Sequence, residues 1–91
     1  MTAPTERERL AGERAIAGAF AELRNGDLRQ ATAARKWITG GSAELAFAAA
    51  LAGLRANTVR SWGEAVATGS RPGAAPMLLR RLRALQSDGV Y

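Results

Sequence analysis

Arginine, amide and hydroxyl side chains follow one another closely in the segment 55–61, RANTVRS. Arginine donates paired hydrogen bonds to phosphate and to guanine, asparagine pairs with adenine, and serine or threonine bonds either a base or a phosphate. These residue types could recognise nucleobase edges if one helix presents them together. The candidate contact residues of the whole chain are Arg55, Asn57, Thr58, Arg60, Ser61, Arg71, Arg80 and Arg81.

The positive charge of the chain increases toward its C-terminal part. The 91 residues carry a net charge of +5. Residues 1–25 contain four arginines and four glutamates, whereas residues 51–91 contain six arginines and two carboxylates. A codon bias toward arginine explains the residue type but not this gradient. A concentration of positive charge indicates an anionic partner, and the phosphates of DNA are such a partner.

Several kinds of chemistry are excluded by what the chain lacks. It contains no Cys and no His, so it has no disulfide, no thiolate metal site and no imidazole base. It also has no glycine-rich loop of the phosphate-binding type. Glu6, Glu8 and Glu13 alternate with arginines, which indicates surface ion pairs rather than a catalytic or metal-binding cluster. We therefore expect no enzymatic activity, no cofactor, no metal ion and no small-molecule substrate.

The chain shows no membrane or export signal. No segment approaches the roughly 20 apolar residues of a membrane-spanning helix. The first ten residues, MTAPTERERL, are charged where a signal peptide would be apolar. We therefore expect a cytoplasmic protein that associates with the nucleoid and not with a membrane.

Capping residues and apolar periodicity predict an all-α fold, a compact five-helix domain over residues 1–91. The first helix covers residues 5–24, with a capping box at Thr5 and Glu8. The second starts at Asp27, with Gln30 completing a similar box, and ends at the break 39–41. The third covers 42–52, the fourth runs from 56 or 57 to 68, and the closing helix covers 75–87. The N-terminal helix, within 1–25, is also a candidate for oligomerisation.

Alanine dominates the apolar residues, so the predicted core is thin. The apolar face of each helix follows from its periodicity. The predicted faces of the first two helices consist of Leu10, Ile16, Phe20 and Leu23, and of Leu28, Ala31, Ala34, Trp37 and Ile38.

The segment 45–62, LAFAAALAGLRANTVRSW, predicts two helices joined by a sharp turn. Ala49 is small enough for the helices to approach, Gly53 accepts the positive φ of a tight turn, and Val59 and Trp62 anchor the second helix. This is the spacing of a helix-turn-helix over residues 42–68. If Val59, Trp62 and Val66 face inward, the residues facing solvent or a DNA groove are Arg55, Asn57, Thr58, Arg60, Ser61 and Glu64.

Residues 42–86 resemble the Cro/phage-repressor (Xre-type) helix-turn-helix proteins. In that family an apolar helix ends at a glycine, a short polar run follows, and a Val or Ile precedes a Trp. A basic loop with Pro and a Leu-rich helix complete the unit. The chain also shows a looser resemblance to small DNA-binding proteins of phages, including small terminase subunits. The residues that match the Xre pattern are Ala49, Gly53, Leu54, Val59, Trp62, Pro72, Leu78, Leu79 and Leu82.

The motif and the charge gradient together predict sequence-specific binding of double-stranded DNA, as in a bacterial or phage transcriptional regulator. One small module reads few base pairs, so we expect a homodimer or a higher homo-oligomer, with either the first or the closing helix as the interface. One alternative is a DNA-packaging subunit of the small-terminase type. Another is a protein–protein adaptor with a basic face, and a third is an Ala-rich bundle in which Gly53 only joins two helices.

Overall fold

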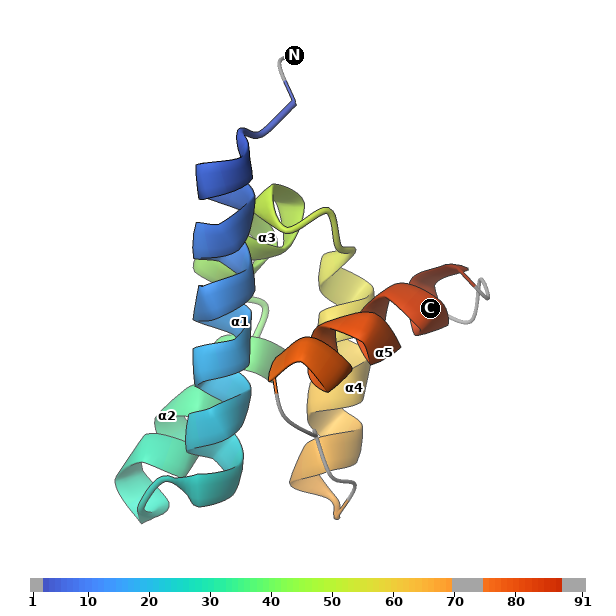
Figure 1. Cartoon of the computed structure of the whole chain (residues 1–91). Helices are drawn as coiled ribbons and strands as arrows, with labels where there is room; N and C mark the ends of the chain where they lie inside the picture. The colour runs from blue at the N-terminus through green and yellow to red at the C-terminus, as the bar shows by residue number, and fades with distance from the viewer. Residues whose placement is uncertain (1–2, 70–74, 88–91) are drawn as a thin grey trace.

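The computed structural model describes residues 3–69 and 75–87, and within them it contains five helices and no strand (Figure 1). The prediction of an all-α fold is confirmed for this part of the chain. The helix bounds differ from the predicted ones by one or two residues. The helices are α1 (Glu6–Asn25), α2 (Leu28–Thr39), α3 (Ala43–Leu51), α4 (Ala56–Ala67) and α5 (Ala75–Ser87).

Local capping fixes where the first three helices begin. Thr5 and Glu8 form the predicted capping box of α1, in which the Glu8 N–H donates to Thr5 Oγ1 at 3.2 Å and the Thr5 N–H donates to Glu8 Oε1 at 2.9 Å. Asp27 and Gln30 form the second predicted box at α2. Ser42 caps α3 through its hydroxyl. Each cap satisfies backbone N–H groups that have no partner inside the helix.

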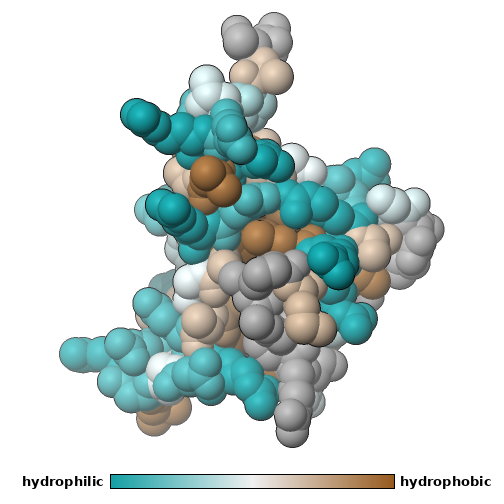
Figure 2. Space-filling model, in the orientation of Figure 1, coloured by the Kyte–Doolittle hydropathy of each residue, from teal (hydrophilic) through white to brown (hydrophobic). Residues whose placement is uncertain are grey.

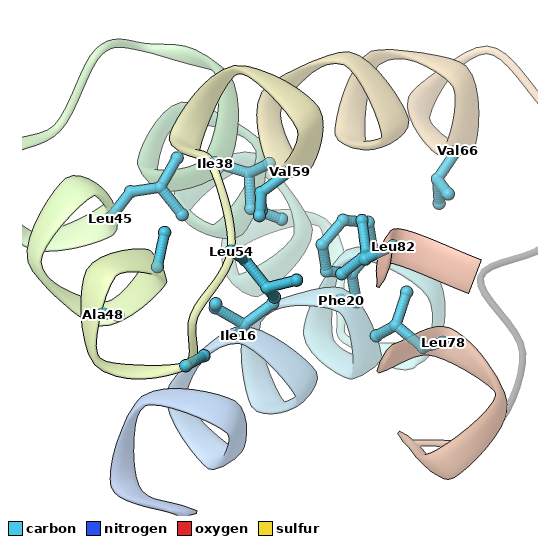
Figure 3. Close-up of a cluster of buried hydrophobic side chains, with 12 residues drawn as sticks. Ile16, Phe20, Ile38, Leu45, Ala48, Leu54, Val59, Val66, Leu78 and Leu82 are labelled. Atoms are coloured by element: carbon cyan, nitrogen blue, oxygen red, sulfur yellow. The ribbon is translucent and has the colours of Figure 1, made fainter. Parts of the chain in front are cut away.

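The helices pack around one interior to which all five contribute. α1 lies against both α2 and α3, α4 packs on α2, and α5 crosses α4 and also contacts α1 (Figure 1). Figure 3 shows side chains from every helix converging, among them Phe20 of α1, Ile38 of α2, Leu45 of α3, Val59 of α4 and Leu82 of α5. All five are almost completely buried. On the face drawn in Figure 2, hydrophilic residues predominate and hydrophobic residues form separate patches.

Two glycines mark close approaches between helices that the sequence analysis did not identify. A Cβ placed on Gly12 of α1 would lie 2.5 Å from the carbonyl oxygen of Ala48 in α3. A Cβ on Gly63 of α4 would overlap Cγ2 of Ile38 in α2. Ala49, which was expected to be the small contact residue, is fully buried as well. The position of α4 therefore depends on small residues in three helices and not only on the α3–α4 pair.

Two residues of the predicted apolar faces are exposed instead. Leu10 is 40% exposed, because Gly12 and Ile16 define the inner face of α1 and Leu10 points away from it. Leu28, the first residue of α2, is 84% exposed. Both predictions were wrong because periodicity alone does not show which neighbouring helix covers a given turn. None of the helices in the described part of the chain is long and apolar enough to cross a membrane.

Candidate nucleic-acid interface

The turn between α3 and α4 is a regular helix-terminating motif. Gly53 has the predicted positive φ, at 72°. The Leu54 N–H donates to Ala49 O at 2.8 Å and the Gly53 N–H donates to Ala50 O at 3.2 Å. These two bonds form a Schellman motif, in which a left-handed glycine ends the helix and satisfies its last carbonyls. Leu54 is buried and anchors the turn in the core, so the direction in which α4 leaves the turn is fixed.

Helix α5 holds this turn from the other side, which the sequence analysis did not predict. The side chain of Gln86 accepts a hydrogen bond from the Arg55 N–H at 2.6 Å and donates one to Gly53 O at 3.3 Å. Arg83 donates to Ala52 O at 3.4 Å. A signal was present in the sequence, because Gln86 continues the inward-facing stripe of Leu78 and Leu82 at intervals of four residues. A polar residue on such a stripe needs a partner.

The first turn of α4 differs from those of α1, α2 and α3. Arg55 occupies the N-cap position, and its own side chain does not cap the helix, although Gln86 of α5 accepts from its N–H. No acidic residue lies in this turn, and unlike α2, where Asp27 is the N-cap, α4 has no acidic N-cap residue. Helix N-termini carry a partial positive charge and N–H groups without intrahelical partners, so an anion is favoured at this position. The exposed guanidinium of Arg55 adds a full positive charge beside it.

One polar stripe runs along the outer face of α4. Asn57 and Glu64 are exposed, and Arg60 and Ser61 are half-buried. Arg60 and Ser61 each lie three or four positions from both Asn57 and Glu64, which places the four residues on one side of a helix. Arg60 Nη1 donates to Asn57 Oδ1 at 3.0 Å. The bond leaves the Asn57 amide donors for a ligand and couples the two side chains, whereas Nε of Arg60 is buried.

Thr58 does not belong to this stripe, and its prediction as a contact residue is corrected here. Its side chain is 0% exposed. Thr58 lies one helical turn before Trp62, so it shares the inward flank of α4 and not the outer face of Asn57. Its polar hydroxyl suggested exposure, but angular position decides burial. In the described part of the chain, three side-chain atoms are buried without a hydrogen-bond partner, and all lie on α4: Thr58 Oγ1, Arg60 Nε and Trp62 Nε1.

Arginines from two other helices border α4. On one side, Arg35 of α2 pairs with Glu64 at 4.0 Å. On the other side, the guanidinium carbon of Arg81 in α5 lies 5.1 Å from the centre of the Trp62 ring. Trp62 and Glu64 are two positions apart and therefore lie on opposite sides of the helix, with Glu64 in the outer stripe. One arginine is thus paired with the acidic residue of the outer stripe, and a second lies next to α4 at Trp62.

The three arginines of α5 divide between two environments. Arg80 and Arg81 are exposed. Arg83 forms an ion pair with Glu13 of α1, whose exposure is only 9%. The expectation that Glu13 makes a surface pair within its own helix was therefore wrong, whereas Arg9 and Glu6 do form such a pair at 3.6 Å. Arg71, another predicted contact residue, lies outside the described residues.

Nothing in the described part of the chain gathers three potential metal ligands of the His, Cys, Asp or Glu type. Comparison of the chain with protein-family models, curated proteins and solved structures found no match. The resemblance to Xre-type proteins therefore stays a prediction from the residues that carry it. The assignment of function has to be argued from the surface of α4 and its surroundings.

Proposed function

We propose that the chain binds double-stranded DNA in a sequence-specific manner, as a transcriptional regulator of bacterial or phage type. In this proposal α3, the turn and α4 act as a helix-turn-helix, and α4 enters the major groove. The observation that carries the proposal is the composition of the outer face of α4. An amide, a guanidinium and a hydroxyl side chain lie together on one partly exposed stripe, with Arg35 at its Glu64 and Arg81 next to Trp62.

In this proposal, specificity for a DNA sequence and overall affinity for DNA come from different residues. Asn57 and Arg60 would contact base edges as a coupled pair, and Ser61 would bond a base or a phosphate. Arg55 and the first-turn N–H groups of α4 would bind a backbone phosphate. Arg80 and Arg81 would contact further phosphates and supply affinity without regard to sequence. Thr58 has no direct role, because its side chain is buried.

The first experiment is selection of binding sites from random duplex DNA, followed by affinity measurements at several salt concentrations. We expect one sequence to be enriched and the affinity to fall steeply with salt. Arg60→Ala should weaken binding to the selected sequence by roughly 5- to 150-fold, corresponding to about 1–3 kcal/mol for a bidentate base contact. The same variant should bind random DNA almost as well as the parent chain does.

A matched set of charge-removing variants separates contact from general electrostatics. Arg80→Ala should weaken binding to selected and random DNA alike and reduce the salt slope by about 1. Arg24→Ala removes the same charge from an exposed position at the end of α1 and should leave affinity and slope nearly unchanged. If no sequence is enriched, or if all three variants lose affinity equally, the assignment of α4 as the reading helix is wrong.

A further inference from the structure

An apolar groove lies on the part of the domain built by α1, α2 and α3, and neither α4 nor α5 lines it. It has a volume of about 500 Å³. Its floor consists of small residues of α1, namely Ala11, Gly12 and Ala15, and one wall is Phe47 of α3. Glu44 is the one charged residue that lines the groove, and it accepts a hydrogen bond from Trp37 Nε1 at 3.1 Å.

Phe47 does not fill this groove in the single chain. Its side chain is 68% exposed, although it is an aromatic residue on a helix whose other face is fully buried. A surface that has both a protruding aromatic ring and a floor of small residues can pair with a copy of itself. In a two-fold interface each surface patch meets its own equivalent, so one copy provides the ring that fills the groove of the other.

The charges along the groove also suit a second copy of the chain. Arg7 and Arg14 are exposed on the α1 side and lie next to Ala11, which forms part of the floor, whereas Glu6 at the same place pairs with Arg9. The α3 side carries Glu44 as its charged residue. When α3 of one copy lies along α1 of the other, the negative side of each groove faces the positive side of its partner. A rim of opposite charges around an apolar centre is typical of specific interfaces.

We propose that two copies of the chain associate through this groove, with Phe47 of each copy packed on Ala11, Gly12 and Ala15 of the other. Arg14 of one copy then faces Glu44 of the second. This pairing leaves the outer face of α4 accessible in both copies, since the groove and that face share no residue. The inference goes beyond the proposed DNA binding and does not depend on it, because it is tested without DNA.

The test is sedimentation equilibrium of the full chain over a range of concentrations. We expect a reversible equilibrium between the 9.6 kDa chain and twice that mass. Phe47→Ser should raise the dissociation constant by about thirtyfold or more, as expected for a central aromatic contact. Leu28→Ser is the matched control, because Leu28 is even more exposed but lies outside the groove. This control variant should associate like the parent chain.

A charge exchange tests the orientation of the two copies. Arg14→Glu and Glu44→Arg should each weaken association, and the double variant should recover most of it, because each pair of facing charges is again opposite. The melting temperature of each variant at low concentration shows that the chain itself still folds. A chain that is monomeric at every concentration, a ring of many subunits, or a Phe47→Ser dimer as tight as the parent would overturn the proposal. Failure of the charge exchange to recover association would overturn the proposed orientation.

Discussion

Two glycines of α1 give opposite predictions for the same substitution. At Gly12 a Cβ would lie 2.5 Å from Ala48 O, 2.9 Å from Leu51 Cβ and 3.0 Å from the Ala52 nitrogen. At Gly18, six residues further along the same helix, a Cβ would have no atom within 4 Å. Gly12→Ala must therefore separate α1 from α3, whereas Gly18→Ala places a methyl group in open space.

The expected magnitudes follow from two terms. Replacing glycine by alanine inside a helix stabilises the folded chain by about 0.5–1 kcal/mol, and this term applies to both positions. Forcing an extra methyl group into a tight contact costs about 1–3 kcal/mol, and this term applies to Gly12 alone. Because the helix term cancels in a comparison, the two variants should differ by about 1–3 kcal/mol in their free energy of unfolding.

Urea unfolding followed by circular dichroism measures this difference, at a low concentration where association contributes little. Gly18→Ala should be more stable than the parent chain, and Gly12→Ala should be less stable than Gly18→Ala. A difference of about 2 kcal/mol corresponds to roughly 8–16 °C in melting temperature for a domain of this size. If both substitutions stabilise the chain equally, α1 and α3 do not approach each other at Gly12, and the packing described here is wrong.

Three further substitutions test individual contacts. Thr58→Val should stabilise the chain by about 1 kcal/mol in thermal unfolding and leave DNA affinity unchanged, because it removes a buried hydroxyl without a partner; a loss of DNA affinity would contradict its inward position. Arg83→Met should lower the free energy of unfolding by about 1–2 kcal/mol, because Glu13 loses its partner, and a neutral result would argue against the pair. The backbone hydrogen bond from Thr5, followed by the bond from its hydroxyl, lowers the pKa of Glu8. A carboxyl with a lowered pKa stabilises the fold above its ordinary pKa and loses this contribution as the pH falls through the lowered one. NMR titration of Thr5→Ala should therefore show the Glu8 pKa raised toward its ordinary value.

The elements that the sequence predicted correctly are those determined by nearby residues. The capping boxes at Thr5 and Asp27 depend on a partner three positions away, and the turn at Gly53 depends on one residue that accepts positive φ. For such features the number of residues between two positions determines how far apart they lie in space, because a helix has a fixed rise and rotation per residue. The starts and ends of the helices were therefore predictable to within one or two residues.

The exposure of individual side chains was less predictable, because it depends on which helix covers each face. Thr58 was assigned to the surface from its polarity, and Leu28 to the core from its hydrophobicity. The angular position of Thr58 beside Trp62 already argued for the inward flank of α4. For Leu28 no comparable signal exists, since its exposure follows from the absence of a covering element near the start of α2 in the described part of the chain.

The contacts between distant parts of the chain could not be derived from spacing at all. Arg83 and Glu13 are 70 residues apart, and Gln86 reaches a turn more than 30 residues away. These contacts arise because α5 crosses the domain and lies next to both α1 and the α3–α4 turn. They also change the interpretation of the charge gradient. Arg83 is one of the arginines from which an anionic partner was predicted, and it forms an ion pair with Glu13 within the fold.

The ion pair of Arg83 sets a limit on the electrostatic contribution of α5 to DNA binding. Of the three arginines of this helix, only Arg80 and Arg81 are exposed, so α5 should contribute about 2 to the slope of log affinity against log salt concentration, at roughly 0.9 for each phosphate contact. Arg83→Met should leave this slope unchanged in a salt titration, provided that the variant is folded. A slope that falls by about 1 in this variant would mean that Arg83 leaves Glu13 when DNA binds. The domain would then exchange an internal ion pair for a phosphate contact, and DNA binding would loosen the attachment of α5 to α1.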